Sequence, residues 1–545
     1  MLRNGYGKAG LPFLFALLLG LAPLAVSAQT EIRILPESAA GSLDGQLEAG
    51  LNLERGGRWG EAISHYENLL REFPNDRAVE KRLEMARLRY DLSRRYNDGS
   101  YCGALATVSA QEALEAYSEV LLKINAHYVT MPRWHEIVAR GTTLLDVALS
   151  DTEFLSRNLP DVERAKIDGF RDELYRTVGQ RAIRSRMEAM DTVTAVARLA
   201  EFRLGLSTTT VAMEYACAAV NGLDTYSTYL TGDQLKDIYS QIEGNFVGLG
   251  VELKADNGAL LLVHIIPGSP AKRAGLVAGD RIVAVDGQST VELSTDRAAS
   301  MLQGAEGSSV AIRVQSESGQ IRDLQVRREH VEVPSVENAK IVEPDLGLAY
   351  LKITSFQKTT IADLDKTLWS LHRQGMRTLI IDLRGNPGGL LTASVEAADR
   401  FLTEGIIVST RGRIAQEDYD YRAHRSGTWG VPLIVLIDGD SASASEIFAG
   451  AIHDNRRGTL IGARSYGKGS VQGIFPLNLA GAGVRLTTAK FFSPNGHPIS
   501  KVGVQPDIVV RHAAKVTGQG ETPRPQGDAV LDAAVEAARA QLARR

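Results

Sequence analysis

The chain has 545 residues, of which 44% are hydrophobic and 23% are charged, and its formal net charge at pH 7 is -4. A chain of this length exceeds a single compact core, so we expect about three or four domains. The near-neutral charge and the lack of a long basic run give no reason to expect a nucleic-acid partner.

The N-terminus has the layout of a secretory signal peptide. Arg3 and Lys8 precede an apolar run over residues 11–26, and small residues follow as far as Ala28. We therefore predict a signal peptide over residues 1–28, cleaved after Ala28, and an exported protein that is periplasmic or extracellular. The alternative is an uncleaved, membrane-associated anchor, but the apolar run is short for a membrane span.

Residues 29–97 are predicted to form a helical hairpin. The segment Gly57-Arg-Trp-Gly-Glu-Ala-Ile-Ser-His-Tyr66, closed by Pro74, resembles one tetratricopeptide (TPR) unit, and a helix over 78–96 follows. One unit cannot bury its own apolar face, so it must stack on a neighbour. The hairpin is either a groove for an adaptor or regulator, or a packing element without a partner.

Residues 98–235 are predicted to be an all-α region that leads into the next domains, with apolar residues at helical spacing over 113–124 and 187–206. It could serve as a spacer or as a homo-oligomer contact. Cys102 and Cys217 bracket much of it. Two cysteines exclude a disulfide scaffold, and the pair is either one disulfide or two buried small side chains.

Short strands interrupted by turn signals fill residues 243–330. They are predicted over 250–253, 260–266, 281–285, 310–315 and 323–328, with one helix over 294–302. With "GSPAKRAGLVAGDRIVAVDG" at its centre, the segment resembles a PDZ domain. The resemblance implies a carboxylate-binding loop formed by Gly248, Leu249, Gly250 and Val251, beside which a protein C-terminus adds as a strand. The alternative is a small β-domain without a ligand.

Residues 331–513 alternate between apolar strands and helices. Strands are predicted over 347–353, 378–383 and 432–438, and helices over 361–374, 390–401 and 444–453. This order predicts an α/β layer whose functional loops lie at the strand ends. Residues 514–545 are predicted to be a linker followed by a terminal helix over 529–542.

The stretch Asp440-Ser-Ala-Ser-Ala-Ser-Glu446 lies where a buried strand passes into a helix. Free N–H groups at a helix start stabilise developing negative charge, so a serine there is a candidate nucleophile. A plain N-cap and a small-residue packing turn are the alternatives. The chain has no Gly-x-Ser-x-Gly elbow, and His453 is too far along the helix to reach Ser443.

Together with DLRGNPGG upstream and GARSYGKGSVQ downstream, SASASEIFAGAIHDNRRGTLIG resembles the C-terminal processing (tail-specific) protease family over residues 220–510. The resemblance implies a serine endopeptidase whose α/β core is of the crotonase/ClpP-like kind. It assigns Ser443 as the nucleophile and Lys468 as its general base, with Gln472 at the position of the family's glutamine. His453 and Gly458 depart from the family pattern away from the proposed site.

The chemistry fits this assignment. A lysine amine can act as a base when burial disfavours its ammonium form, and the Gln472 amide can hold the lysine nitrogen if the stretch makes one helical turn. The resemblance implies two oxyanion donors, the backbone N–H of Ala444 and that of a glycine in NPGG. Gly388 and Gly389 both qualify, and Gly389 is favoured. No metal or cofactor is implied.

The sequence leaves two alternative functions. The first is a non-catalytic PDZ/TPR scaffold with a relic protease domain, but a relic has no chemical reason to keep a serine, a lysine and a glutamine together. A nucleotide-binding loop beginning at Gly462 would need a hydroxyl directly after Lys468, where Gly469 stands. We also expect that the PDZ segment gates the protease.

Overall fold

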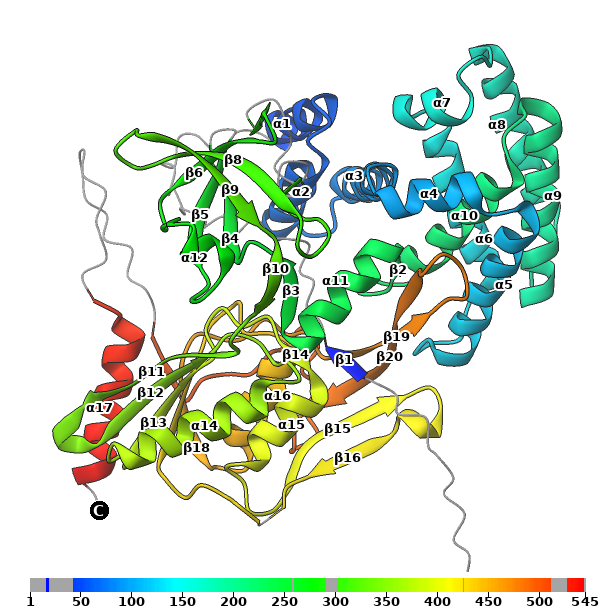
Figure 1. The fold of residues 1–545 in the computed structure, drawn as a ribbon. Coiled ribbons are helices and arrows are strands. Elements are labelled where there is room, and N and C mark those ends of the chain that lie inside the picture. The colour runs from blue at the N-terminus through cyan, green and yellow to red at the C-terminus, as the bar shows by residue number, and fades with distance from the viewer. Residues whose placement is uncertain are drawn as a thin grey trace, which may run out of the picture.

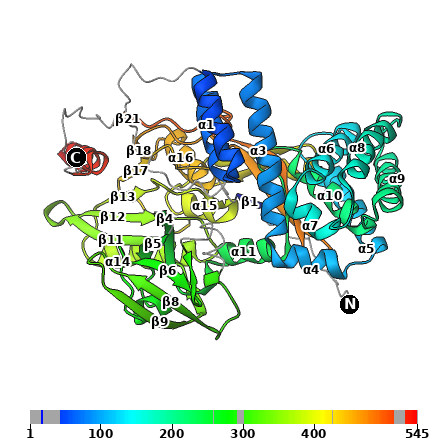
Figure 2. The same ribbon diagram turned by 90° about the horizontal axis from the view of Figure 1, so that it is seen from above.

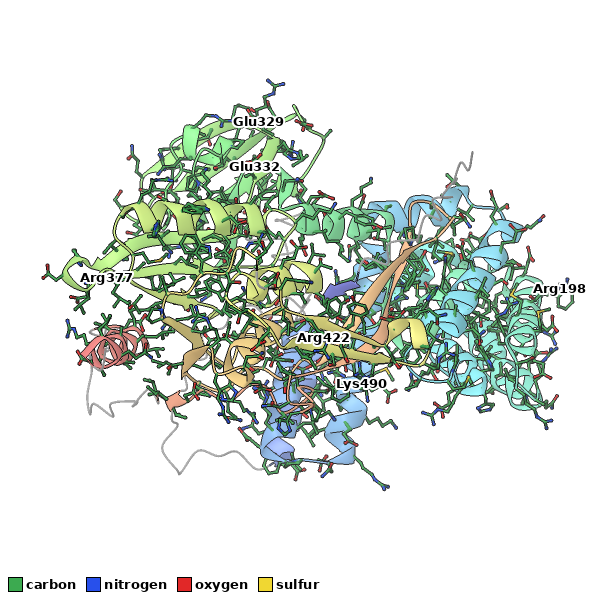
Figure 3. All side chains as sticks on the ribbon, turned by 90° about the horizontal axis from the view of Figure 1, so that it is seen from below. Arg198, Glu329, Glu332, Arg377, Arg422 and Lys490 are labelled. Atoms are coloured by element: carbon green, nitrogen blue, oxygen red, sulfur yellow. The ribbon has the colours of Figure 1, made fainter. Side chains whose placement is uncertain are left out.

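The fold is described from a computed structural model over residues 16–18, 43–256, 259–290, 301–424, 426–510 and 527–543. The predicted cleavage after Ala28, residues 294–300 of the predicted PDZ helix and residues 514–526 of the predicted linker lie outside these ranges. An all-α region lies at one end of the molecule and the C-terminal helix at the other (Figures 1 and 2). Arg198 and Arg377 mark these two ends in Figure 3.

Three helices occupy residues 43–96, where the sequence predicts a helical hairpin: α1 (Leu43–Arg55), α2 (Trp59–Glu72) and α3 (Arg77–Tyr96). The aromatic and aliphatic positions of the TPR-like pattern, among them Tyr66 and Leu69, are buried between these helices. Helix α3 runs beyond the hairpin, and Tyr96 at its end belongs to the core of the next region.

The all-α region comprises α4 (Gly99–Thr107), α5 (Ala110–His127), α6 (Trp134–Ala148), α7 (Thr152–Asn158), α8 (Arg164–Gly179), α9 (Arg186–Leu204) and α10 (Thr208–Asn221). Helix α10 is buried along almost its whole length. Arg95 of α3 donates to the buried carboxylate of Glu214 at 2.6 Å, which joins the hairpin to this core. Cys102 and Cys217 are both free thiols, so the structure does not contain the disulfide considered from the sequence.

A short connection, β2 (Thr228–Leu230) and α11 (Gly232–Glu243), leads to the predicted PDZ domain. The domain is joined to the rest of the chain through the antiparallel pair β3 (Asn245–Gly248) and β10 (Glu329–Glu332). Glu329 and Glu332, the first and last residues of β10, are labelled in Figure 3. The sheet of this domain has the order β4-β5-β6-β8-β9, with β7 paired to β6. The elements are β4 (Val251–Asp256), β5 (Ala259–Ile265), α12 (Pro270–Arg273), β6 (Arg281–Val285), β7 (Gln288–Ser289), β8 (Ser309–Gln315) and β9 (Ile321–Arg327).

The predicted α/β core contains a mixed sheet of order β11-β12-β13-β17-β18-β21, in which all neighbours are parallel except the edge pair β11 and β12. The strands are β11 (Val336–Glu343), β12 (Leu348–Ile353), β13 (Thr378–Asp382), β17 (Leu433–Ile437), β18 (Gly458–Gly462) and β21 (Ile508–Val509). The turn η2 (Pro344–Leu346) joins the first two strands.

Each face of this sheet packs on helices because alternate side chains point to opposite faces. Leu351, Ile381 and Val435 share a core with α14 (Thr360–Arg373), α15 (Leu391–Asp399) and α16 (Ala444–Asp454). On the other face, Ile380 and Ile434 pack on Val530 and Ala534 of α17 (Ala529–Ala543), coloured red in Figure 1. The predicted α/β layer and its terminal helix are thus both present.

The second sheet of the core has the order β14-β1-β19-β20-β15-β16, with β2 paired to β20. Its strands are β14 (Gly389–Leu390), β1 (Ala16–Leu18), β19 (Ser470–Pro476), β20 (Gly483–Phe492), β15 (Ile406–Gly412) and β16 (Tyr419–Arg422), the last two joined through η3 (Ala415–Glu417). The short strand β1, from the predicted signal segment, lies antiparallel to both β14 and β19. The described helices include none that is long and apolar enough to span a bilayer.

Helix α17 is tied to the loop that follows β13. Arg384 donates to both oxygens of Asp528, at 2.8 and 2.7 Å, and also to Asp382 at 2.6 Å. Asp528 in turn accepts the backbone N–H of Leu531 at the start of α17. Arg384 therefore fixes this loop through two carboxylates, that of Asp382 at the end of β13 and that of Asp528 just before α17.

Candidate active site

Ser443 stands between β17 and α16, as the sequence predicted. Its backbone has φ 60° and ψ -112°, a conformation that non-glycine residues seldom adopt and that costs free energy. Its side chain is buried. Strain of this kind is concentrated at functional sites, because the surrounding structure must impose it.

The serines on either side of Ser443 hold its turn against the DLRGNPGG loop. Ser441 Oγ donates to the carbonyl of Leu383 at 2.8 Å, and Ser445 Oγ donates to the carbonyl of Asn386 at 3.0 Å. The backbone N–H of Ala442 donates to the same Asn386 oxygen. The alternation in SASAS thus reflects one central serine and two serines that fix it to the neighbouring loop.

Gly388 of the NPGG segment lies directly beside Ser443, the predicted nucleophile. A Cβ on Gly388 would stand 2.8 Å from the Ser443 Cβ and 3.0 Å from the backbone nitrogen of Ala444. The Gly388 N–H already donates to Asn386 Oδ1 at 2.8 Å. That donor is therefore committed, and the preference for Gly389 as the oxyanion donor stays a prediction. Ala444 is the first residue of α16, where backbone N–H groups lack intrahelical partners.

Gly388→Ala should lower kcat for peptide cleavage by about 10²-fold, since a displacement of about 1 Å at a reacting group costs that much. Gly385→Ala is the matched control, because Gly385 also has a positive φ of 70° but no atom lies within 4 Å of its added Cβ. It should cost stability alone, about 1–2 kcal/mol. Equal kcat values for the two variants would contradict this account of the loop.

Lys468 precedes β19 and is 3% exposed. Burial, reinforced by the positive charge of Arg485, lowers the pKa of Lys468 to about 7, although Glu446 and Asp224 oppose the shift. Its Nζ lies 4.9 Å from the centre of the Tyr226 ring. A lysine with this pKa is in large part a neutral amine at pH 7 and can accept a proton.

The carboxylate of Glu446 joins the two loops that carry Ser443 and Lys468. Its Oε2 accepts the backbone N–H of Ser443 at 2.7 Å and that of Lys468 at 2.8 Å. Its Oε1 accepts the N–H of Gly467 at 2.7 Å and the hydroxyl of Ser465 at 2.6 Å. The Glu446 carboxylate accepts four hydrogen bonds and donates none, as an ionised carboxylate does, even though burial raises the pKa of Glu446. Oε2 of Glu446 therefore fixes the distance between the backbones of Ser443 and Lys468.

Gln472 lies at a different place from the one expected. Residues 470–476 form the strand β19, so no helical turn brings Gln472 back to Lys468. Its Nε2 donates to the carbonyl and hydroxyl of Ser470, at 3.1 and 2.9 Å. Its buried Oε1 accepts no hydrogen bond from the described residues, so the predicted bond to Lys468 is not made in this structure.

Sequence reasoning missed three residues of the site: Glu446, Tyr226 and Arg485. Glu446 had a local signal, since it follows Ser443 at the third helical position, where a carboxylate caps the helix start. Tyr226 and Arg485 had none, because they reach Lys468 from a turn and a strand distant in the sequence. His453 is paired with Asp454 and Asp507, in keeping with the expectation that it does not serve the nucleophile.

The predicted PDZ loop joins β3 to β4. Gly250 has φ 81°, and a Cβ there would meet Ser269 at 2.2 Å, so the glycine is required by close packing. The carbonyls of Leu249 and Gly250 accept backbone N–H groups of Ala271 and Ile266. The loop is thereby fixed to the segment that precedes β6. Gly248 and Val251 end and begin the flanking strands.

Comparison with known proteins identifies the family. A model of peptidase family S41 matches residues 347–510, and a PDZ-domain model matches residues 263–316. The carboxy-terminal-processing protease of Bartonella bacilliformis is 38% identical over 302 residues, which cover 54% of this chain and 68% of that protein. The corresponding protease of Picosynechococcus sp. is 34% identical over 290 residues, covering 53% and 70%.

Among solved structures, a photosystem II D1 C-terminal processing protease covers 73% of this chain and 93% of its own, with 24% identity and a TM-score of 0.40. The family assignment rests on the sequence matches, because the two relatives are more than 30% identical to this chain over most of their own length. The chain belongs to peptidase family S41 and is a carboxyl-terminal-processing serine protease with a PDZ domain.

Proposed function

We propose that this protease cuts substrate proteins at a bond upstream of their C-terminus, using Ser443 and Lys468 as a catalytic dyad. The observation that carries the proposal is a buried lysine with a pKa of about 7 whose backbone shares one Glu446 oxygen with the backbone of Ser443. The shared Glu446 oxygen thus joins the segments that carry the buried amine and the strained, buried serine.

The proposed steps follow from these positions. The Lys468 amine takes the Ser443 proton as Oγ attacks the scissile carbonyl carbon, and the N–H groups of Ala444 and Gly389 hold the resulting oxyanion. The lysine then gives its proton to the leaving amine, and an acyl-enzyme remains. Water, deprotonated by the same lysine, attacks the ester carbonyl carbon, the bond to Ser443 Oγ breaks, and the lysine returns the proton to that oxygen.

The β1 segment supports an extended polypeptide as the substrate. Leu18 is paired with Gly389, and Leu17 is paired with both Leu390 and Gln472, so a peptide backbone fits between β14 and β19 beside the proposed oxyanion donors. Strand addition of this kind uses backbone hydrogen bonds and is tolerant of sequence. A substrate chain in the same slot would bring its carbonyls toward Ser443.

We further propose that the PDZ domain captures the substrate's terminal carboxylate at residues 248–251 and gates the core. The test uses one unstructured polypeptide with an apolar last residue, prepared with a free carboxylate or as the amide. Cleavage of the amide should show a kcat/KM lower by about tenfold, chiefly through KM, as one charge-assisted contact is lost. Identical kcat/KM values for the two forms would exclude capture by the carboxylate.

The pH dependence of cleavage follows from the pKa of Lys468. Since the base is the neutral amine, kcat/KM should rise with pH through about 7 and level off above it. A reaction that needs the ammonium form would instead show a kcat/KM that falls as the pH rises through about 7. Initial rates at low substrate concentration between about pH 5.5 and 9 measure the limb, and a flat profile would argue against Lys468 as the base.

Export and partner binding are also proposed. The basic, apolar and small-residue pattern of residues 1–28 supports export with cleavage after Ala28, which N-terminal sequencing of the mature chain tests. The TPR-like pattern of α2 and α3 supports docking of an adaptor or regulator on the hairpin. Deleting residues 29–76 should then remove adaptor-dependent stimulation while leaving basal cleavage of an unstructured peptide intact.

A further inference from the structure

Arg485 of β20 carries a buried positive charge that is not directly bonded to a carboxylate of the described residues. Its side chain is almost fully buried, and its Nε donates to the carbonyl of Tyr226 at 3.0 Å. Its Nη1 is buried and makes no hydrogen bond to the described residues. No carboxylate within the described ranges forms an ion pair with it. Burying an unpaired guanidinium costs stability, so a role outside packing is expected.

Asp224 is near Arg485 but is engaged elsewhere. Its Oδ1 accepts the backbone N–H groups of Tyr226 and Ser227, at 2.7 and 2.8 Å, and the hydroxyl of Thr487 at 3.2 Å. Its other oxygen accepts the hydroxyl of Ser227. This carboxylate therefore fixes the 224–227 turn against β20, and its charge offsets that of Arg485 without a direct bond.

Tyr226 contacts both cations. Its carbonyl accepts from Arg485, and its ring lies 4.9 Å from the Lys468 Nζ. The charged and titratable groups that face Lys468 are the carboxylates of Glu446 and Asp224, the Tyr226 phenol and the Arg485 guanidinium. The two carboxylates and the ring face favour an ammonium ion, whereas burial and Arg485 disfavour it.

We propose that Arg485 is a positioning residue for catalysis, whose unpaired buried charge, held by the Tyr226 carbonyl, keeps Lys468 in the neutral form that accepts the Ser443 proton. The proposal rests on the dyad function proposed above. An arginine suits this role because the pKa of its guanidinium starts well above that of a lysine amine, which leaves a wide margin before burial can remove the charge. Even here, burial lowers the pKa of Arg485 only to about 10, so the charge persists at neutral pH.

The test compares pH profiles of kcat/KM for wild type, Arg485→Gln and Arg485→Lys. The glutamine can still donate to the Tyr226 carbonyl but is neutral, so the midpoint of the acid limb should move up by about one pH unit. At pH 7 this corresponds to a loss of about fivefold in kcat/KM, recovered near pH 9. Arg485→Lys keeps a positive charge at neutral pH and should show a clearly smaller shift.

Arg457→Met is the control, because Arg457 also donates to backbone carbonyls, those of Phe401, Trp429 and Val431, but is not among the charges that act on Lys468. It should lower Tm and leave the midpoint in place, whereas Arg485→Gln should shift the midpoint with Tm unchanged or raised.

An unshifted midpoint in Arg485→Gln, or equal shifts in the glutamine and lysine variants, would overturn the role of the charge. If Arg485→Gln does not fold, Arg485→Lys decides on its own. In that case its midpoint must stay within about half a pH unit of wild type for the proposal to stand. A wild-type profile of kcat/KM with no rise near pH 7 would instead contradict the proposed Ser443–Lys468 dyad. Failure of the Arg485 proposal and failure of the dyad are therefore distinguishable.

Discussion

Ser443→Ala and Lys468→Ala should each lower kcat for peptide cleavage by about 10⁴-fold or more, as removal of a nucleophile or its base does in other serine proteases. The alanine at 443 cannot form an acyl-enzyme, and the alanine at 468 leaves the hydroxyl without a proton acceptor. Neither change should lower Tm much, because the first deletes one oxygen and the second removes a buried amine that burial disfavours.

Two matched variants show whether the loss is specific. Ser445→Ala deletes a hydroxyl only two residues from the nucleophile, where it binds the Asn386 carbonyl, and should cost far less activity. Lys490→Ala removes an exposed lysine of β20, labelled in Figure 3, and should leave kcat unchanged. Cleavage by Ser443→Ala at the wild-type rate would refute the dyad. The same inactive variant should retain bound substrate and allow its recovery.

Glu446→Gln should reduce both activity and stability, although the two side chains have nearly the same shape. The carboxylate accepts from four donors, whereas an amide offers one oxygen and turns two donors of its own toward the remaining N–H groups. Each buried donor left without an acceptor costs about 1–3 kcal/mol. Because the shared oxygen sets the spacing of Ser443 and Lys468, kcat should fall by about 10²-fold.

Ser465→Ala is the control for this variant, since it removes one of the four donors and leaves the carboxylate in place. It should lower the free energy of unfolding by about 1 kcal/mol and change kcat little. Thermal unfolding and single-turnover cleavage of an unstructured peptide measure the two effects. A Glu446→Gln enzyme with wild-type kcat and Tm would show that the bridge is not needed.

Local patterns predicted most of the regular elements of the protease core. The helix expected over 444–453 is α16 at Ala444–Asp454, and the strand expected over 432–438 is β17 at Leu433–Ile437. Such agreement arises because buried parallel strands and amphipathic helices have distinct apolar periods. The second sheet was not predicted as a whole, because its order joins β14, β1, β19 and β15 from segments far apart in the sequence, although β19 with β20 and β15 with β16 are local antiparallel pairs.

The sequence by itself indicated the family, and its long motifs predicted Ser443 as the nucleophile and Lys468 as the base. It also favoured Gly389 over Gly388 as the oxyanion donor, which stays a prediction. Only the tertiary structure decided what surrounds the lysine. Gln472 turned to Ser470, while Glu446, Tyr226 and Arg485 converged on Lys468. The reason is physical: the charge state of a buried amine depends on every dipole and charge within a few ångströms, and those neighbours come from segments that only folding brings together.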